Sequence, residues 1–388
     1  MSPVSKKDYF KSIVSRYKKA SRKEKARILD EFCLNCSYNR KYAIWKLASF
    51  KPQRRTKVKT KPGRKSRYNL PEILKPLQQI WLTANLPCSK RLKAILPIWI
   101  SFYQSEFGFL TPGILQKLET ISASTIDRIL KPFRILHTGT GKCTTKPGLL
   151  LKHHIPIKTN QWDEAKPGFL ETDTVAHCGN SLEGTFVYTV DTVDIATGWT
   201  EQRAVWGKGE ADVLTQIKDI ESCLPFPILG FDCDNGSEFL NWHLVRHFQD
   251  RKNPVQFTRS RPYQKNDNAH VEQKNWTHVR QWLAYNRFDN PQITPLLNNL
   301  YRNEWRFFLN FFLPSMKLQE KKRIASRIVK KHDDPKTPFQ RCLDSKFVSP
   351  QSKRFLKQLY KNLNPFKLRT TIDQKIAQIR RLARLGAL

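Results

Sequence analysis

FDCDNGSEF, at residues 231–239, is the stretch that decides how this 388-residue chain folds. Its apolar start predicts a short buried strand that ends at Asp234, and Asn235-Gly236 after an aspartate is favourable turn chemistry. Gly236 would let the backbone approach a phosphate, because no Cβ stands in the way. The stretch therefore predicts a strand end that presents a carboxylate, and the segments on either side are interpreted from it.

Regular elements surround this stretch in an α/β order. Alternating or continuous apolar runs predict strands, and amphipathic runs predict helices. We predict three strands, a helix, a strand, a helix, a strand and a helix, at residues 169–176, 185–193, 199–206, 210–223, 226–234, 239–249, 255–258 and 268–285. This order predicts an α/β sheet of the ribonuclease-H-like type within residues 165–290.

Three carboxylates occur at matching places in this order. Asp173 lies in LETDT at 170–174, Asp234 ends the strand described above, and Glu272 lies in NAHVEQKN at 268–275 on the last predicted helix. Two divalent cations about 3.5–4 Å apart can promote in-line phosphoryl displacement, and Mg²⁺ takes only a few carboxylates from a protein. We predict that Asp173, Asp234 and Glu272 are the catalytic residues and the ligands of two Mg²⁺ ions, for which Mn²⁺ could substitute.

Each of these carboxylates also has a purely structural interpretation. Asp173 could simply end a strand, Asp234 could be only the first residue of a turn, and Glu272 could be an exposed helical charge. Asp232 lies on the same strand face as Asp234 and could be the ligand instead. Three matched segments in order are more specific than any one of them, which favours the catalytic interpretation.

The three segments resemble the catalytic core of retroviral integrases and bacterial insertion-sequence transposases. That family has an Asp in an opening strand, a second in an Asp-Asn-Gly-x-x-Phe segment and a Glu on a helix about 35 residues later. Here 37 residues separate Asp234 from Glu272, slightly more than the family spacing. The resemblance implies a DDE-type transposase, which cleaves DNA at the ends of a mobile element and joins the freed 3′-OH to a target. A ribonuclease-H-like nuclease that cuts without joining, and a DNA-binding regulator with an inactive core, are the alternatives.

The resemblance also implies that the helix carrying Glu272 follows bound DNA. Lys274, Asn275 and Arg280 lie on that helix, and Arg259 and Arg261 precede it. All five are predicted DNA-binding residues. Solvated helix charges are the alternative for Lys274 and Arg280.

The charge of the chain is unevenly distributed. Lys and Arg number 69 against 33 Asp and Glu, a net charge of +36. Residues 1–150 carry a net of +24, residues 151–290 a net of −4 and residues 291–388 a net of +16. Such basic flanks around a mildly acidic block indicate a polyanionic partner, which we predict to be double-stranded DNA at element ends and at the target. A ribosomal or membrane-surface protein is the alternative for a basic stretch in general.

The first basic arm, residues 1–50, has the pattern of a helix-turn-helix unit. Ser21 is a predicted N-cap, and a predicted basic helix at 38–50 follows a break at 35–37. We expect the apolar side chains of that helix to be buried and the basic ones exposed, with Tyr42, Ile44, Trp45 and Leu47 inside and Arg40, Lys41 and Lys46 outside. Because the second helix of such a unit enters a major groove, Arg40 and Lys41 are predicted DNA-binding residues. A plain helical hairpin is the alternative.

Residues 51–67, KPQRRTKVKTKPGRKSR, form a predicted basic linker. They include nine basic residues, two prolines, a glycine and no aromatic residue, so they cannot pack a core. Arg64 and Lys65 resemble a minor-groove arm, and contacts to phosphates alone are the alternative. Residues 68–138 return to helical periodicity and predict a second helical DNA-binding unit, and residues 139–164 predict another linker.

Residues 291–388 form a basic C-terminal region that we assign to DNA handling or oligomerisation. YRNEWRFFLNFFLPSMKL at 301–318 is aromatic, and aromatic side chains at helical spacing are more often core than base-stacking platforms. Residues 371–385 place Ile372, Ile376, Ile379 and Leu382 on one helical face. That face could pack on its own domain or pair two subunits, and we expect a homo-oligomer on DNA.

The remaining features indicate a cytoplasmic, nucleoid-associated protein with no membrane partner. No apolar run approaches the ~20 residues that a membrane helix needs, and the N-terminus lacks the apolar stretch of a secretory signal. Eight cysteines without a disulfide framework fit reduced thiols. Cys33 and Cys36 form a lone C-x-x-C with no histidine before His137, which favours buried thiols over a zinc site.

Overall fold

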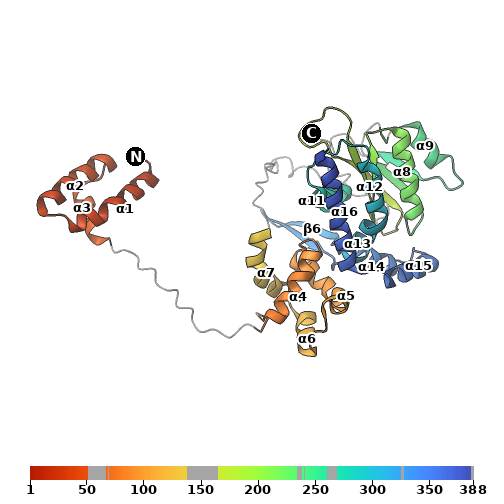
Figure 1. Cartoon of the computed structure of the whole chain (residues 1–388), viewed down its shortest axis with the longest axis horizontal. Coiled ribbons are helices and arrows are strands. Elements are labelled where there is room, and N and C mark those ends of the chain that lie inside the picture. The colour runs from red at the N-terminus through yellow and green to blue at the C-terminus, as the bar shows by residue number, and fades with distance from the viewer. Residues whose placement is uncertain are drawn as a thin grey trace. The chain divides into compact units, whose positions relative to one another are not determined.

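The computed structural model describes residues 1–50, 67–68, 70–137, 165–233, 238–239, 241–259, 269–324 and 327–385. The chain divides into two compact units, Met1–Ser66 and Arg67–Leu388, whose elements are labelled in Figure 1. Among the helices of these residues, none is both long and apolar enough to span a membrane.

Three helices make up the first unit: α1 (Pro3–Lys19), α2 (Arg22–Cys36) and α3 (Arg40–Ser49). The predicted cap of α2 is confirmed, because the Ser21 hydroxyl accepts the Glu24 N–H and the Glu24 carboxylate accepts the Ser21 N–H. This reciprocal pair is a capping box, which satisfies two N–H groups that the helix leaves open. Phe32, Ala43 and Leu47 are fully buried among the three helices.

The predicted burial of the apolar side chains of α3 is wrong at three of the four positions. Leu47 is buried, but 43% of Tyr42, 41% of Ile44 and 63% of Trp45 is exposed. The reason is α1, which was not predicted from the sequence and whose apolar side chains, including Phe10, complete the core. Because α1 and α2 cover the face of α3 that carries Ala43 and Leu47, the side chains on its other faces, Tyr42, Ile44 and Trp45, are exposed to solvent.

The second unit is built on a five-stranded mixed sheet in the order β3-β2-β1-β4-β5. Its strands are β1 (Phe169–Ala176), β2 (Val187–Asp194), β3 (Thr200–Trp206), β4 (Gly230–Cys233) and β5 (Gln256–Arg259). β2 is antiparallel to β1 and β3, whereas β4 is parallel to β1 and β5. Parallel neighbours need crossover connections, which α8 (Glu210–Cys223) and α9 (Trp242–Gln249) provide. The predicted order of strands and helices is confirmed, and the mixed sheet with its helices fits a ribonuclease-H-like core.

The helical segment that follows β5 packs against the central strands of the sheet. α10 (Ala269–Lys274) continues into a π-helical segment, η2 (Asn275–Arg280), and then into α11 (Gln281–Leu283). α10 packs against β1 and β2. π-helical segments are rare and occur frequently at functional sites. This one begins beside the strand that carries Asp173.

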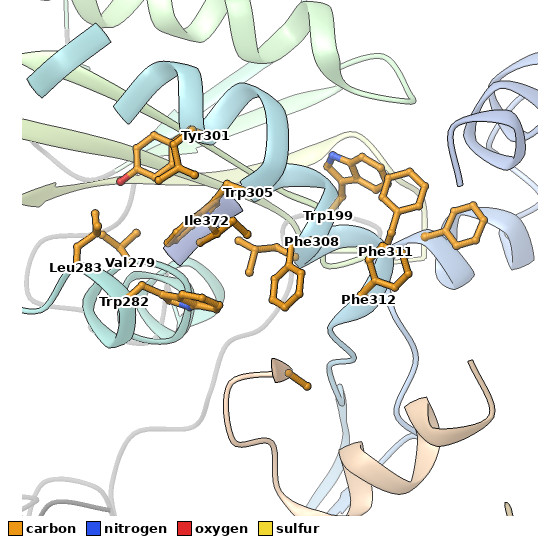
Figure 2. Close-up of a cluster of buried hydrophobic side chains, with 14 of the residues drawn as sticks. Trp199, Val279, Trp282, Leu283, Tyr301, Trp305, Phe308, Phe311, Phe312 and Ile372 are labelled. Carbon is orange, nitrogen blue, oxygen red and sulfur yellow. The ribbon is translucent and has the colours of Figure 1, made fainter. Parts of the chain in front are cut away.

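The aromatic segment at 301–318 lies largely in the hydrophobic core and is not exposed for base stacking, which agrees with the more frequent role of such segments. α12 (Ile293–Leu300), η3 (Tyr301–Trp305) and α13 (Arg306–Phe312) follow one another directly. Figure 2 shows their aromatic side chains packed with Trp199 and Trp282, where the Trp282 and Trp305 ring centroids are 5.0 Å apart. Ile372 of α16 (Pro365–Leu385) is buried in the same cluster. The apolar face of α16 therefore packs on its own unit, which decides between the two predicted alternatives.

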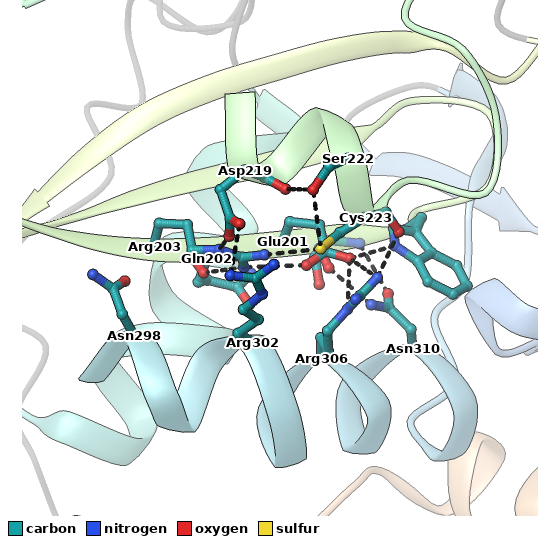
Figure 3. Close-up of polar contacts among 12 residues, drawn as sticks. Glu201, Gln202, Arg203, Asp219, Ser222, Cys223, Asn298, Arg302, Arg306 and Asn310 are labelled. Carbon is teal, nitrogen blue, oxygen red and sulfur yellow. Dashed lines mark hydrogen bonds and ion pairs between the residues drawn. The ribbon is translucent and has the colours of Figure 1, made fainter. Parts of the chain in front are cut away.

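Two asparagines of these helices cover the edge of the sheet at β3 (Figure 3). The Asn298 amide accepts the Ala204 N–H at 2.7 Å and donates to the Ala204 carbonyl at 2.8 Å. Asn310 makes the same pair of bonds with Thr200, at 2.9 and 2.8 Å. Since an open strand edge can pair with another chain, these amides take the place of a neighbouring strand.

Four helices precede the sheet: α4 (Pro71–Thr83), α5 (Ser89–Phe107), α6 (Pro112–Thr120) and α7 (Ala123–His137). The Trp99 ring of α5 makes edge contacts with Phe308, Phe312 and Phe366, and its Nε1 donates to the Phe312 carbonyl at 3.3 Å. These helices, predicted as a separate region, thus share one hydrophobic core with the C-terminal helices.

A second, small sheet is separate from the first (Figure 1). It is an antiparallel ribbon of β6 (Leu318–Ile324) and β7 (Arg327–His332), followed by α14 (Pro338–Asp344) and α15 (Pro350–Lys361). The sequence pattern predicts no strand here. Charged residues interrupt the apolar alternation on which strand prediction depends.

Candidate functional site

Asp173 lies on the central strand β1 with its side chain half-buried. Its Oδ1 accepts the Thr174 N–H at 2.7 Å, and its Oδ2 accepts the Asn275 side-chain amide at 2.7 Å. Asn275 begins η2, three residues after Glu272. The structure therefore places two of the predicted catalytic residues, Asp173 and Glu272, on elements that contact each other directly.

Glu171 fixes the start of the helix that carries Glu272. Its buried carboxylate accepts the backbone N–H groups of His270 and Val271 at 2.9 and 3.0 Å. The first N–H groups of a helix lack partners within it, so a carboxylate there satisfies them and interacts favourably with the helix dipole. Sequence reasoning missed Glu171, although it lies two residues before Asp173 on the same strand face.

Glu272 is exposed on α10. This exposure fits a ligand that faces a bound cation, and it also fits the alternative of a solvated helical charge. The neighbouring Asn275 shows a clearer functional signal, because its Oδ1 is buried and has no hydrogen-bond partner among the described residues. Buried polar atoms are normally paired, so an unpaired oxygen next to Asp173 indicates a place for a further group.

β4, in the segment predicted as a strand that ends at Asp234, lies beside β1. Cys233, the last residue of β4, is the register partner of Thr172, which precedes Asp173. Asp234 follows Cys233 in the sequence and lies outside the described residues, so its role stays a prediction. Asp232 accepts the hydroxyl of Thr258 on β5 at 2.6 Å, a contact between neighbouring strands.

Glu238 is a polar residue of FDCDNGSEF to which the sequence pattern assigned no role. Its buried carboxylate accepts Lys208 Nζ at 2.5 Å and the Thr174 hydroxyl at 3.1 Å. Burial acts to raise the pKa of Glu238, but the hydrogen bonds from Lys208 and Thr174 outweigh it and hold that pKa below its usual value. Glu238 thus attaches the chain after β4 to the residue that follows Asp173.

Lys274 does not lie at the surface as a phosphate contact requires. It is 8% exposed, and its Nζ lies 3.4 Å from Nε2 of His278. Burial lowers the pKa of Lys274 to about 8, against the attraction of Asp191. The cause is helix register: Lys274 follows the buried Val271 by three residues, so both face the sheet.

Asp191 is a fully buried acid on β2, the strand next to Asp173. It is the register partner of Asp173 and accepts Gln202 Nε2 at 2.8 Å. Burial raises the pKa of Asp191 to about 7, although the Gln202 hydrogen bond and Lys274 act to lower it. Asp191 is thus a further buried acid near the site, in addition to Glu171 and Glu238.

The other predicted DNA-binding residues are placed as follows. The Arg280 guanidinium is half-buried and lies 4.6 Å from the centre of the Tyr285 ring. Arg40 is exposed on α3 and pairs with Asp30 of α2, and Lys41 is exposed beside it. Outside the described part of the chain are the side chain of Arg259 and the whole of Arg64, Lys65 and Arg261.

The oxygen-donor side chains on β1, α10 and η2 suit a hard cation. The carboxylates of Asp173 and Glu272 and the amide oxygen of Asn275 are all oxygen donors, which Mg²⁺ and Mn²⁺ prefer over softer ligands. Within the described residues, no three His, Cys, Asp or Glu side chains gather as a metal site. Asp234 would have to complete the set, so the residues that the structure describes fit the predicted ions without forming the whole site.

Comparison with solved structures returns retroviral integrases at low similarity. A simian T-cell lymphotropic virus intasome in complex with the PP2A regulatory subunit B56 gamma matches at 12% identity and a TM-score of 0.33, over 62% of this chain and 73% of that chain. The catalytic core of BIV integrase matches at 14% identity and a TM-score of 0.28, over 46% and 95%. The HTLV-2 integrase catalytic core in complex with magnesium matches at 14% identity and a TM-score of 0.29, over 39% and 93%. Scores this low establish neither fold nor function, so the fold assignment rests on the sheet order.

Sequence comparison gives a much stronger match. No protein-family model matches the chain. The uncharacterized protein y4rM of Sinorhizobium fredii is 36% identical over 345 residues, which cover 88% of this chain and 96% of y4rM. Similarity of this extent over nearly the full length of both proteins shows common descent. The chain therefore belongs to the same protein family as y4rM.

Proposed function

We propose that this protein is a DDE-type transposase, a polynucleotidyl transferase that cleaves DNA at the ends of a mobile element and joins the freed 3′-OH to target DNA. The observation that carries the proposal is the junction of β1 with α10 and η2. There the Asn275 amide donates to Asp173, and the Glu171 carboxylate accepts N–H groups at the start of the helix of Glu272. The same chain has a net charge of +36. A carboxylate site on a protein built for a polyanion suits metal-assisted phosphoryl transfer on DNA.

Asp173, Asp234 and Glu272 would hold two Mg²⁺ ions, or Mn²⁺ in their place. When bound, the ions would supply activation of the attacking oxygen and stabilisation of the leaving oxygen. The Asn275 amide fixes the orientation of the Asp173 carboxylate, and Glu171 fixes the start of the helix beside it. Groups positioned before the reaction lower its barrier, because less reorganisation is needed when it occurs.

Exposed cations of both units would hold the DNA. Arg40 and Lys41 are exposed on α3, and the third helix of the first unit would enter a groove. Arg64, Lys65 and Arg261 belong to the proposal by sequence alone, as does the side chain of Arg259, and we expect a homo-oligomer to assemble on DNA. Lys274 leaves the set of phosphate contacts because it is buried.

The test compares the wild-type chain with Glu272→Gln on labelled DNA from either side of its own gene, in Mg²⁺. Glu210→Gln is the matched control, because Glu210 is also exposed in the first turn of a core helix. We expect cleavage and joined products from the wild type and the control. In Glu272→Gln we expect a loss on the order of 10³-fold or more, with DNA binding unchanged.

Three outcomes would contradict the proposal in different ways. Nicking without joining would indicate a nuclease. If Glu272→Gln retained cleavage, a residue other than Glu272 would have to supply the third carboxylate. Tight binding with no metal-dependent cleavage by the wild type would leave a DNA-binding protein without the chemistry.

A further inference from the structure

The β6–β7 ribbon carries a charge that its own packing does not explain. Residues 318–332 include six Lys or Arg and one Glu, a net charge of +5. Its side chains Lys322, Arg323, Lys330 and Lys331 are exposed. Ile328 and Val329, at 46% and 49%, are exposed as well. The ribbon therefore presents both cations and apolar surface to solvent.

The register of the two strands makes one pair of like-charged residues partners, Lys321 and Lys330. The one acid, Glu320, is the register partner of Lys331 and also pairs with Lys322 at 2.5 Å on its own strand. Like charges directly opposite destabilise an antiparallel pair, and an isolated two-stranded hairpin is only marginally stable in water. An anion bound along the ribbon would remove this repulsion.

The base of the ribbon, in contrast, is firmly held. Ser315 and Lys336 exchange backbone hydrogen bonds at 3.0 and 3.1 Å. Asp333 accepts the Lys317 N–H at 2.6 Å and the Arg341 guanidinium of α14 at 2.6 Å. Arg341 also donates to the Ser315 carbonyl at 3.0 Å. An exposed element on a fixed base is positioned before its partner arrives, which lowers the cost of ordering it on binding.

We infer that the β6–β7 ribbon is a contact for duplex DNA, with its exposed cations on phosphates and its apolar side chains against the groove. The major groove of B-DNA admits a two-stranded β-ribbon, and a phosphate backbone is the anion that a row of lysines fits. The inference rests on the proposed function, since it names one element by which the same protein holds its substrate. It does not depend on the three carboxylates.

The experiment measures binding of the whole chain to a random-sequence DNA duplex over a range of salt concentrations. The ribbon variant is Lys322→Gln, Lys330→Gln and Lys331→Gln together. The control is Arg354→Gln, Lys357→Gln and Lys361→Gln on α15, which removes the same charge from another exposed basic element of the same unit. Equal thermal melting of the three proteins checks that the substitutions leave the fold intact.

We expect the ribbon variant to bind with a salt dependence reduced by up to about 2.7 in logarithmic slope, from about 0.9 for each lost phosphate contact. Near 0.1 M salt, its affinity should be roughly 10- to 100-fold weaker than that of the wild type. The control should stay within about threefold of the wild type, because screened charges away from the DNA contribute little.

The outcomes separate this inference from the proposed function. A wild type that does not bind duplex DNA overturns both. A wild type that binds, with the ribbon variant equal to the control, overturns the ribbon contact alone. Loss of self-association in the ribbon variant with normal DNA binding would also overturn it and assign the ribbon to a second copy.

A second measurement tests the same contact without substitutions, in case the ribbon variant misfolds. Lysine acetylation of the wild type, with and without the duplex, should show Lys330 and Lys331 protected by DNA. Equal reactivity in both states overturns the inference.

Discussion

Two junctions between a strand and a distant helix use the same side chain in different ways. At β3, Asn298 and Asn310 each use both the oxygen and the nitrogen of the amide on the backbone of the strand. At β1, Asn275 uses its nitrogen on Asp173, and its buried oxygen is unpaired among the described residues. An unpaired buried polar atom costs about 1–3 kcal/mol. The β3 junction is therefore built for stability, whereas the β1 junction gives up stability to place a carboxylate.

The largest expected effect tests the stabilising half of this comparison. In Asn310→Ala, the buried N–H and carbonyl of Thr200 both lose their partner. We expect the free energy of unfolding to fall by about 2–5 kcal/mol, from two groups left unpaired. Denaturant titration of the purified protein measures this change.

Asn303→Ala on η3 is the matched control. Asn303 is exposed and donates only to the Asn299 carbonyl on its own helix, at 2.8 Å. Its loss should change stability by no more than about 0.5 kcal/mol. If Asn310→Ala were as mild as Asn303→Ala, water would be replacing the amide and the edge of β3 would not depend on it.

The second prediction contrasts two aspartates. Asp173 is half-buried, whereas Asp194 is fully buried and accepts hydrogen bonds from Gly168 N–H, Thr197 N–H and the Thr197 hydroxyl at 2.6–2.7 Å. Gly168 has a φ of +114°, and a Cβ there would lie 2.4 Å from the Pro227 carbonyl oxygen, so only glycine fits beside this turn. Asp194 is thus a structural acid.

Burial raises the pKa of Asp194 to about 6, although its hydrogen bonds act to lower it. Because this exceeds the ~3.9 of an unfolded aspartate, the folded state holds the proton more tightly. The resulting stability is fully present below about pH 4 and is lost as the pH rises through about 6. Relative to Asp194→Asn, the wild type should therefore lose roughly 2–3 kcal/mol between pH 4 and pH 7. Parallel stability profiles of the two proteins would show that the folded-state pKa of Asp194 is not raised.

Local sequence patterns predicted the order of the core elements but not the long-range hydrogen bonds that connect them. Each strand and helix from 169 to 285 is set by apolar periodicity within its own few residues, so the sequence predicts it. Glu171 bonds the backbone 99 residues away, at His270, and Asn310 bonds Thr200 at a separation of 110. No local pattern marks such contacts. Asp173 and Glu272 could be proposed as site residues because their segments match a known motif, whereas the burial of Lys274 depends on how α10 docks.

Two further misses have different causes. The apolar residues of α1, such as Phe10, Ile13 and Val14, are at helical spacing, so that helix was predictable from the printed sequence. The β6–β7 ribbon was not, because it lacks the apolar alternation that marks a strand with one buried face.

The smallest expected effect tests the functional half of the comparison. In Asn275→Ala, Asp173 loses the hydrogen bond that orients Oδ2, but water can replace it at a half-buried carboxylate. We expect stability to change by less than about 1 kcal/mol, because the Asn275 oxygen, which has no partner in the described part of the chain, disappears with the amide. If Asn275 positions Asp173 for the proposed reaction, and does not make the DNA contact that the resemblance implies, kcat should fall roughly tenfold while KM for DNA stays unchanged, since the lost contact acts on the reacting geometry. Gln273→Ala, at an exposed position on the same helix, should leave both constants unchanged. A fall in stability to match the fall in kcat would instead make Asn275 a structural residue like Asn298 and Asn310, and the two junctions would then differ in place but not in purpose.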